Sequence, residues 1–243
     1  MKKIAIIGGK SLLETNFWKR GKKKEIFIPY GKVSFSSFGN LISICRHGRK
    51  GEIPPHKINH KANIFSLRKL GAKEIFSFNS VGSLKRKIKP GDFLIPDDFI
   101  DFDPPTFFDE KAVFSTPAIS EKLRKILIKF AKKLKLKFHS NGIYFNTKGP
   151  RLETKAEINL IKNFADVVGM TMAKEATLAK ELNLEYASLC SIDNFAHGII
   201  KKPLTQREIE KNQRKSSKIF EKVIEELNKS HLPAVRGNYE NSN

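Results

Sequence analysis

The sequence predicts an α/β domain with a central mixed β-sheet flanked by helices, and three observations lead to this prediction. Short apolar runs rich in β-branched residues recur along the chain, as at residues 4–7 and 41–45. Longer segments such as 120–136 repeat their apolar residues at helical spacing. The two kinds of segment alternate across all 243 residues without a linker, repeat or low-complexity stretch. We therefore expect one domain, over residues 1–229.

The predicted strands are apolar runs that end at glycine or at polar residues, as the buried strands of a covered sheet do. The run at 4–7 ends in a Gly-Gly pair, and Gly31 divides the run at 25–37. In chain order, the predicted strands are 4–7, 25–37, 41–45, 74–78, 93–95, 143–146, 167–168 and 186–192.

The predicted helices have recognisable ends or carry an apolar stripe. Residues 59–70 stop at Gly71, which is typical of a helix C-terminus. Thr154 with Glu157 forms a capping box at the start of a helix over 154–163. Further helices are predicted over 120–136, 174–182 and 205–227. Residues 230–243 are predicted to be a flexible tail.

The balance of charge is strongly basic, with 46 Lys and Arg against 25 Asp and Glu and a net charge of +21. A basic surface is the first sign of nucleic-acid binding. Lys outnumbers Arg, however, and Arg is the side chain suited to bidentate phosphate and base contacts. We therefore interpret most of the charge as solvated lysine and expect no nucleic-acid partner, with a nucleic-acid-binding module as an alternative hypothesis.

The two cysteines and the apolar runs bear on the compartment. Cys45 and Cys190 each lie in an apolar run, which favours buried free thiols over a disulfide. The apolar run near the N-terminus is too short for a signal peptide, and no run approaches the roughly 18 apolar residues of a membrane span. We expect a cytoplasmic protein with no membrane partner.

The first candidate site residues follow the first and third predicted strands. Gly9, Lys10 and Ser11 lack the preceding glycine of a nucleotide-triphosphate loop, but the glycine amides are able to cradle a small anion. Arg46 and His47 follow residues 41–45 and would bring a cation and an imidazole to the same sheet edge. The alternatives are a simple turn and two surface cations.

Polar or small residues also follow the later strands. Ser80 follows the strand at 74–78, and Glu153 precedes the helix at 154–163, where a carboxylate would also complement the helix dipole. Thr171 and Asn194 come shortly after the strands at 167–168 and 186–192. Five such strand ends exceed what chance loops usually supply, and we expect them to gather at one site.

An ordered set of motifs covers nearly the whole chain. The motifs are Arg46-His47-Gly48, Pro55-His56-Lys57-Ile58-Asn59, Ala62-Asn63, Val81-Gly82-Ser83-Leu84, Pro90-Gly91-Asp92, Pro96-Asp97, Gly149-Pro150-Arg151-Leu152-Glu153-Thr154-Lys155-Ala156-Glu157, Val168-Gly169-Met170-Thr171, Glu175, Ala179-Lys180-Glu181 and Asp193-Asn194. Taken in this order, the chain resembles the trimeric purine nucleoside phosphorylase and methylthioadenosine phosphorylase family. The resemblance implies a nucleoside-phosphorylase-like fold.

The resemblance also implies a reaction. Members of this family cleave a purine nucleoside with inorganic phosphate, giving free base and ribose 1-phosphate or its 5-methylthio analogue. Inorganic phosphate is then the co-substrate, and no other cofactor and no metal is expected. The family completes its pocket with a neighbouring chain, so the resemblance implies a homotrimer or a dimer of trimers.

By position, the resemblance assigns roles to residues of this chain. Three residues are implied as catalytic: Asn194, Glu153 and His47. The phosphate site would comprise Gly9, Lys10, Ser11, Arg46, His47, Ser80 and Thr171. The substrate site would comprise Leu152, Glu153, Met170, Asp193 and Asn194.

The pair of Glu153 and Asn194 favours one class of base. A carboxylate accepts a hydrogen bond from N1–H, which inosine, guanosine and 5′-methylthioinosine have and adenosine lacks. An Asn amide donates to O6 and accepts from a protonated N7. Adenine-specific members have Asp at the Asn194 position and again at Ala196. We therefore predict phosphorolysis of 6-oxopurine nucleosides, in purine salvage.

Three departures from the family pattern keep alternatives open. Lys10 stands where Ser or Thr is usual, Asp193 where Thr is usual and Lys174 where Pro is usual. A catalytically impaired purine- or phosphate-binding protein and a 5′-methylthioadenosine phosphorylase are the alternative hypotheses. Whether the 5′ substituent is hydroxyl or methylthio stays open, as does hypoxanthine against guanine.

Overall fold

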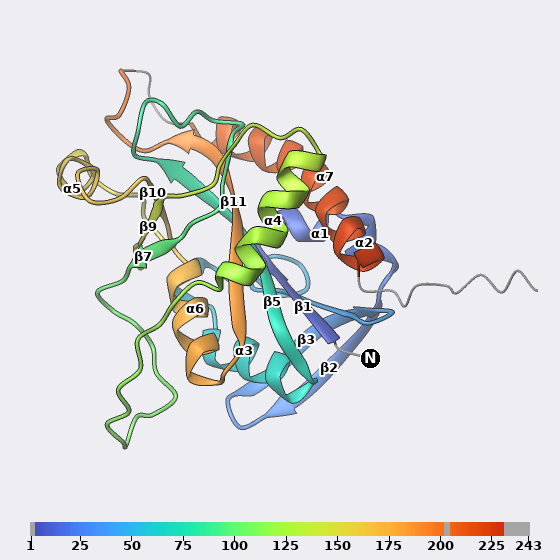
Figure 1. Cartoon of the computed structure of the whole chain (residues 1–243). Helices are drawn as coiled ribbons and strands as arrows, with labels where there is room; N and C mark the ends of the chain where they lie inside the picture. The colour runs from blue at the N-terminus through green and yellow to red at the C-terminus, as the bar shows by residue number, and fades with distance from the viewer. Residues whose placement is uncertain (1–2, 202–204, 231–243) are drawn as a thin grey trace, which may run out of the picture.

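A mixed eleven-stranded sheet runs through the computed structural model, which describes residues 3–201 and 205–230 (Figure 1). Its strands are β1 (Lys3–Gly8), β2 (Lys22–Ile28), β3 (Gly31–Phe38), β4 (Leu41–Cys45), β5 (Ala72–Ser83), β6 (Phe93–Leu94), β7 (Asp98–Ile100), β8 (Phe138–His139), β9 (Ile143–Asn146), β10 (Val167–Gly169) and β11 (Glu185–Phe195). The helices are α1 (Lys10–Leu13), α2 (Asn16–Arg20), α3 (His60–Lys69), α4 (Glu121–Lys133), α5 (Lys155–Ile161), α6 (Met172–Glu181) and α7 (Gln206–Ser230), with a 3₁₀ turn at Pro55–Lys57.

Four central strands run parallel and bring their carboxyl ends to one edge. β1 lies between β4 and β5, parallel to both, and β11 is parallel to β5. The outer strands are mixed, since β3 is antiparallel to β4 and β10 is antiparallel to β5. Ligands of open α/β sheets bind outside the carboxyl ends of their strands, so this edge is where a site is expected.

Both faces of the sheet are buried, and helices cover each face. Along β1, Ala5 and Ile7 join the apolar cluster under α3 and α6. Ile4 and Ile6 point the other way, into the cluster under α1, α2, α4 and α7. Figure 1 shows α3 and α6 on one side of the central strands and α4 and α7 on the other. Side chains alternate between the two faces of a strand, so β1 packs against a helical layer on each side of the sheet.

The predicted fold class is confirmed, and β4 and β9 have the predicted bounds. Two strands continue well past their predicted C-terminal ends, because their backbone pairing extends beyond the apolar run. β5 continues through Ser83 and β11 through Phe195, paired with each other to their ends. Ser80 and Asn194 therefore lie within strands and not in the loops after them. The prediction also missed α1, α2, β7 and β8, which are too short to show a hydrophobic period.

The remaining expectations have mixed outcomes. Both cysteines are free and buried, as predicted. Within the described residues, no helix is long and apolar enough to cross a membrane. Of the predicted tail at 230–243, Ser230 is the last residue of α7, and residues 231–243 lie outside the described part of the chain.

Candidate active site

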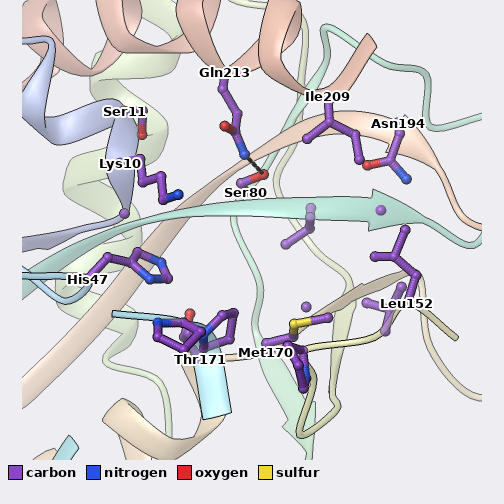
Figure 2. A pocket seen from close by; sticks show the side chains of 18 of the residues that line it. Lys10, Ser11, His47, Ser80, Leu152, Met170, Thr171, Asn194, Ile209 and Gln213 are labelled. Atoms are coloured by element: carbon purple, nitrogen blue, oxygen red, sulfur yellow. Dashed lines mark hydrogen bonds between the residues drawn. The ribbon is translucent and has the colours of Figure 1, made fainter. Parts of the chain in front are cut away.

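A cavity of about 550 Å³ opens at the carboxyl edge of the central strands. Figure 2 shows its elongated arrangement, with Lys10, His47 and Thr171 at one end and Leu152 and Asn194 at the other. We call these the anion end and the base end. The predicted site residues that line the cavity are Gly9, Lys10, Ser11, Arg46, His47, Ser80, Leu152, Glu153, Met170, Thr171 and Asn194. The sheet topology thus gathers eleven of the twelve predicted residues.

Gly9 opens the space at the anion end. It follows β1 as the N-cap of α1, and a Cβ placed there would lie 3.5 Å from Arg46 Nη1 and 3.8 Å from His47 Cδ2. The missing side chain leaves room for a small ion between these groups. Lys10 and Ser11 line the cavity from the first turn of α1. Within residues 3–201 and 205–230, the structure gives Lys10 no ion pair, so its ammonium is available to an anion.

Arg46 uses most of its hydrogen-bond donors on groups of the protein itself. Its side chain is buried, and Nε lies 2.5 Å from Glu175 Oε1 while Nη2 lies 3.2 Å from Oε2. Nη2 also donates to Ser77 Oγ and Nη1 to the Phe78 carbonyl, each at 2.9 Å. In this geometry Arg46 does not have two free donors with which to bind a phosphate. What remains for an anion is the free N–H of Nη1, which faces Gly9.

His47 presents a hydrogen-bond acceptor to the cavity, and not a donor. Its Nδ1 lies 2.7 Å from the Ile53 carbonyl, and because a carbonyl only accepts, Nδ1 carries the hydrogen. Burial, followed by the charge of Arg46, lowers the pKa of His47 to about 4. The ring is then neutral at pH 7, and Nε2 is an acceptor. It suits a protonated oxygen, such as the hydroxyl of hydrogen phosphate, and not a bare phosphate oxygen.

Thr171 and Ser80 supply hydroxyl groups to the anion end. Thr171 is buried at the start of α6, and its Oγ1 accepts from Asn79 Nδ2 at 2.9 Å, which leaves its hydroxyl hydrogen for a ligand. The amides of Thr171 and Met172 are already bound to the Tyr144 hydroxyl. Ser80 is exposed to the cavity and accepts from Gln213 Nε2 at 3.2 Å (Figure 2).

Asp193 is the one predicted site residue that does not line the cavity. Its side chain is fully buried behind Ser80, to which it is hydrogen-bonded, and its Oδ1 accepts from Ser191 Oγ at 2.8 Å. The predicted direct contact with substrate is therefore wrong. Lys174, the other departure, points away from the cavity toward Asp103, with Nζ 3.5 Å from Oδ2.

Two polar groups stand at the base end. Glu153 is buried on the loop before α5, and its Oε1 accepts from Thr147 Oγ1 at 2.7 Å. Asn194 lies near the end of β11, and its Nδ2 donates to the Phe195 carbonyl at 2.9 Å. A carboxylate has further lone pairs, and an amide nitrogen has a second N–H, so both keep capacity for a ligand. Glu153 therefore offers a ligand an acceptor, and Asn194 offers both a donor and an acceptor.

Apolar side chains complete the base end. Leu152 is 49 % exposed beside Glu153 and points to the cavity (Figure 2). Met170 lines the floor, and its sulfur approaches Gly149 so closely that a Cβ there would lie 2.5 Å away. Gly149 has φ +66, so both its conformation and this contact require glycine.

Sequence reasoning missed the residues that α7 and one loop contribute. Ile209, Glu210 and Gln213 line the cavity from α7, and His197 lines it just beyond β11. The sequence shows that the C-terminal helix is amphipathic, but this pattern does not indicate which of its residues line a cavity. Among the described residues, no group of three His, Cys, Asp or Glu side chains is placed to hold a metal.

Comparison with known proteins identifies the family. The profile of the Phosphorylase superfamily matches residues 3–229. The chain belongs to this superfamily. It is 41 % identical to a probable 6-oxopurine nucleoside phosphorylase of Archaeoglobus fulgidus, over 92 % of this chain and 94 % of the relative. It is 44 % identical to a probable S-methyl-5′-thioinosine phosphorylase of Methanocaldococcus jannaschii, over 92 % and 91 %.

A solved structure supports the same assignment. The methylthioadenosine phosphorylase of Schistosoma mansoni in complex with adenine superposes with a TM-score of 0.80, at 25 % identity over 92 % of this chain and 90 % of that one. The family resemblance drawn from the ordered motifs is confirmed by these matches.

Proposed function

We propose that the protein catalyses the phosphorolysis of 6-oxopurine nucleosides in purine salvage, with inorganic phosphate as co-substrate and no further cofactor. The observation that carries this proposal is that one and the same cavity has anion-binding groups at one end and the Glu153 and Asn194 pair at the other. The relatives named as 6-oxopurine nucleoside and methylthioinosine phosphorylases support the same activity.

At the anion end, phosphate would lie over Gly9. Lys10 supplies the positive charge, because the charge of Arg46 is balanced by Glu175. The free Nη1 hydrogen of Arg46 and the hydroxyls of Ser11, Ser80 and Thr171 donate to phosphate oxygens. His47 Nε2 accepts from the phosphate hydroxyl. In this role His47 both orients phosphate and selects its hydrogen phosphate form.

At the base end, the purine would lie between Leu152 and the end of β11. Glu153 accepts a hydrogen bond from N1–H of a 6-oxopurine, whereas the lone pair on N1 of adenine would face its negative charge. Asn194 donates to O6 with its second N–H, and its Oδ1 accepts from N7–H. Met170 would lie under the ribose.

The reaction follows from these two positions. The bond between C1′ and N9 breaks with its electron pair passing to the purine, and the sugar becomes cationic in the transition state. A phosphate oxygen below C1′ stabilises that charge and then bonds to C1′. Hydrogen phosphate loses its proton as it becomes the sugar ester, and a proton from solvent reaches N7, so the base leaves as a neutral molecule. Asn194 and Glu153 stabilise the purine as N7 becomes protonated. Preorganised charges of this kind are worth most where they meet charge that develops in the transition state.

We further propose that the protein is a cytoplasmic homotrimer or dimer of trimers. Exposed aromatic side chains support an association surface, since Phe102 is 85 % and Phe114 98 % exposed. Light scattering after size-exclusion chromatography measures the mass directly. A monomer at working concentration would reject this part of the proposal.

A methylthioadenosine phosphorylase is the second candidate, favoured by the similarity to the Schistosoma mansoni enzyme. One assay separates the two candidates: inosine, guanosine, 5′-methylthioinosine, adenosine and 5′-methylthioadenosine are incubated with phosphate, and base release is followed by chromatography. We expect release of hypoxanthine and guanine. Release of adenine alone would favour the second candidate, and binding without turnover would favour an impaired binding protein.

A further inference from the structure

A β-bulge places Asp193 behind the cavity wall. In the pairing of β11 with β5, Ile192 lies opposite Val81 and Asn194 opposite Gly82, so Asp193 is the extra residue. Its side chain is fully buried, and its main-chain carbonyl accepts from Asn212 Nδ2 at 2.6 Å. Bulges next to active sites re-aim side chains, and this one turns a carboxyl group toward the back of Ser80.

The carboxyl group of Asp193 is bound by hydroxyls and not by a cation. Oδ2 is hydrogen-bonded to Ser80 Oγ and Oδ1 to Ser191 Oγ. No ion pair of Asp193 is found within residues 3–201 and 205–230. On β11, the nearby titratable group is the thiol of Cys190, and burial raises its pKa to about 12. On α7, the groups that face this region are the uncharged side chains of Asn212 and Gln213. A buried carboxylate without a cation is costly in its ionised form.

The protonation state of Asp193 determines whether the hydroxyl hydrogen of Ser80 is available to a ligand. When Asp193 is ionised it only accepts, so the single hydrogen of Ser80 is spent on Oδ2. When Asp193 is protonated it donates to Ser80 Oγ, which also accepts from Gln213 Nε2. Both lone pairs of Ser80 are then filled, and its hydrogen is free to point into the cavity.

We propose that Asp193 is a positioning residue that sets the donor direction of Ser80, so that the anion end binds phosphate most tightly when Asp193 carries a proton. The inference rests on the proposed function, since it takes phosphate as the ligand beside Ser80. In the ionised form, a phosphate oxygen would meet only the lone pairs of Ser80, or the buried carboxylate would lose one of its two hydroxyl partners.

The direction of the pH effect follows from linkage. Burial raises the pKa of Asp193 to about 7, so the group is protonated in mildly acidic solution and ionised in alkaline solution. If the anion is bound by the protonated form, its affinity falls as the pH rises through this value. The limiting slope is about tenfold per pH unit.

Sulfate is the probe that isolates this effect, because it stays a dianion across the range while phosphate itself titrates. Sulfate has no hydrogen to donate to His47 Nε2 and is expected to bind more weakly than phosphate, but His47, whose pKa is about 4, is neutral throughout the range, so this weakening is the same at every pH. The inhibition constant of sulfate against phosphate, and its dissociation constant by calorimetry, are measured between about pH 6 and about pH 9. For the unmodified protein both constants are expected to rise by at least about tenfold. The KM for nucleoside is expected to change much less, since Asp193 does not face the base.

Asp193→Asn is the decisive variant. Its amide donates to Ser80 and accepts from Ser191, as the protonated acid does, but it has no proton to lose. We expect its sulfate constants to stay within about twofold over the same range. Ser191→Ala is the matched control, because it removes the other hydroxyl partner without touching the cavity. In this variant the sulfate constants should still rise with pH. The midpoint of the rise should move to higher pH, because the ionised form of Asp193 loses the hydrogen bond from Ser191.

Two outcomes would overturn the proposal. One is an Asp193→Asn protein that shows the same rise as the unmodified protein. The other is a Ser80→Ala protein that retains the rise, a test that stands if Asp193→Asn does not fold, because Ser80 is exposed. Calorimetry needs no turnover, so the proposal is tested even if phosphate-dependent base release is absent and the proposed function fails.

Discussion

The two ends of the cavity are held by the protein in different ways. At the anion end, Arg46 and Thr171 are buried and His47 is half-buried, and each is already hydrogen-bonded to the protein. At the base end, Glu153 and half-exposed Leu152 lie on the loop before α5. The anion end is fixed mainly at the ends of strands, whereas the base end combines Asn194 of β11 with a loop and with Ile209 of α7.

This contrast suggests different contributions to catalysis. Groups held by a rigid framework need no reorganisation when charge develops, so the anion end is preorganised. At the base end, Leu152 is 49 % exposed, so a purine that packs against it would bury apolar surface. We expect changes at the anion end to act on stability and phosphate binding, and changes at the base end to act on nucleoside turnover.

Glu175→Gln should have the largest effect. It removes the charge that balances Arg46 and leaves a buried guanidinium uncompensated, which costs about 3–5 kcal/mol of unfolding free energy. Urea denaturation measures this loss. The matched control is Glu157→Gln, which breaks the exposed pair with Arg151 and should cost far less. Equal losses in both variants would contradict a rigid anion end.

Asn194→Ala should have the next largest effect, and on turnover. Without the amide, nothing at this position accepts from N7–H, and kcat/KM for inosine should fall by about 10²–10³. Steady-state kinetics with saturating phosphate measures the fall. Asn159→Ala, on the exposed surface of α5, is the control and should keep full activity. An unchanged rate for Asn194→Ala would remove this residue from the mechanism.

Lys10→Met should act on phosphate alone. The variant keeps an unbranched side chain, one atom shorter, but loses the charge, and the KM for phosphate should rise by about tenfold while the KM for nucleoside changes little. Lys19→Met, which removes an exposed lysine of α2 paired with Glu14, is the control. If both variants raise the KM equally, overall charge attracts phosphate and Lys10 does not contact it.

Leu152→Phe should have the smallest effect, and it should improve nucleoside binding. An aromatic ring beside the purine adds stacking worth about 0.5–1.5 kcal/mol, so the KM for nucleoside should fall by a few fold. Leu160→Phe, at an exposed position of α5, serves as the control and should leave the KM unchanged. A higher KM for Leu152→Phe would mean that the pocket is already full at this position.

Local signals in the sequence predicted much of the fold and most of the site. The strand β4 and the capping box at Thr154 depend on neighbouring residues, and both are found as predicted. The gathering of site residues follows from a general rule, because parallel strands carry their carboxyl ends to one edge. These features need no knowledge of distant contacts.

The features that the sequence did not predict depend on contacts between distant residues. Glu175 pairs with Arg46 across 129 positions, and Gln213 reaches Ser80 across 133. The tautomer of His47 depends on which carbonyl meets its ring, here that of Ile53. A bulge in β11 turned Asp193 from a substrate contact into a buried partner of Ser80. No residue pattern along the chain encodes these geometries.

The most direct test of the central claim is to follow inosine with and without phosphate by phosphorus NMR and chromatography together. The account predicts that hypoxanthine and ribose 1-phosphate appear in equal amounts, and only when phosphate is present. Free ribose in place of ribose 1-phosphate, or hypoxanthine released at the same rate without phosphate, would contradict it.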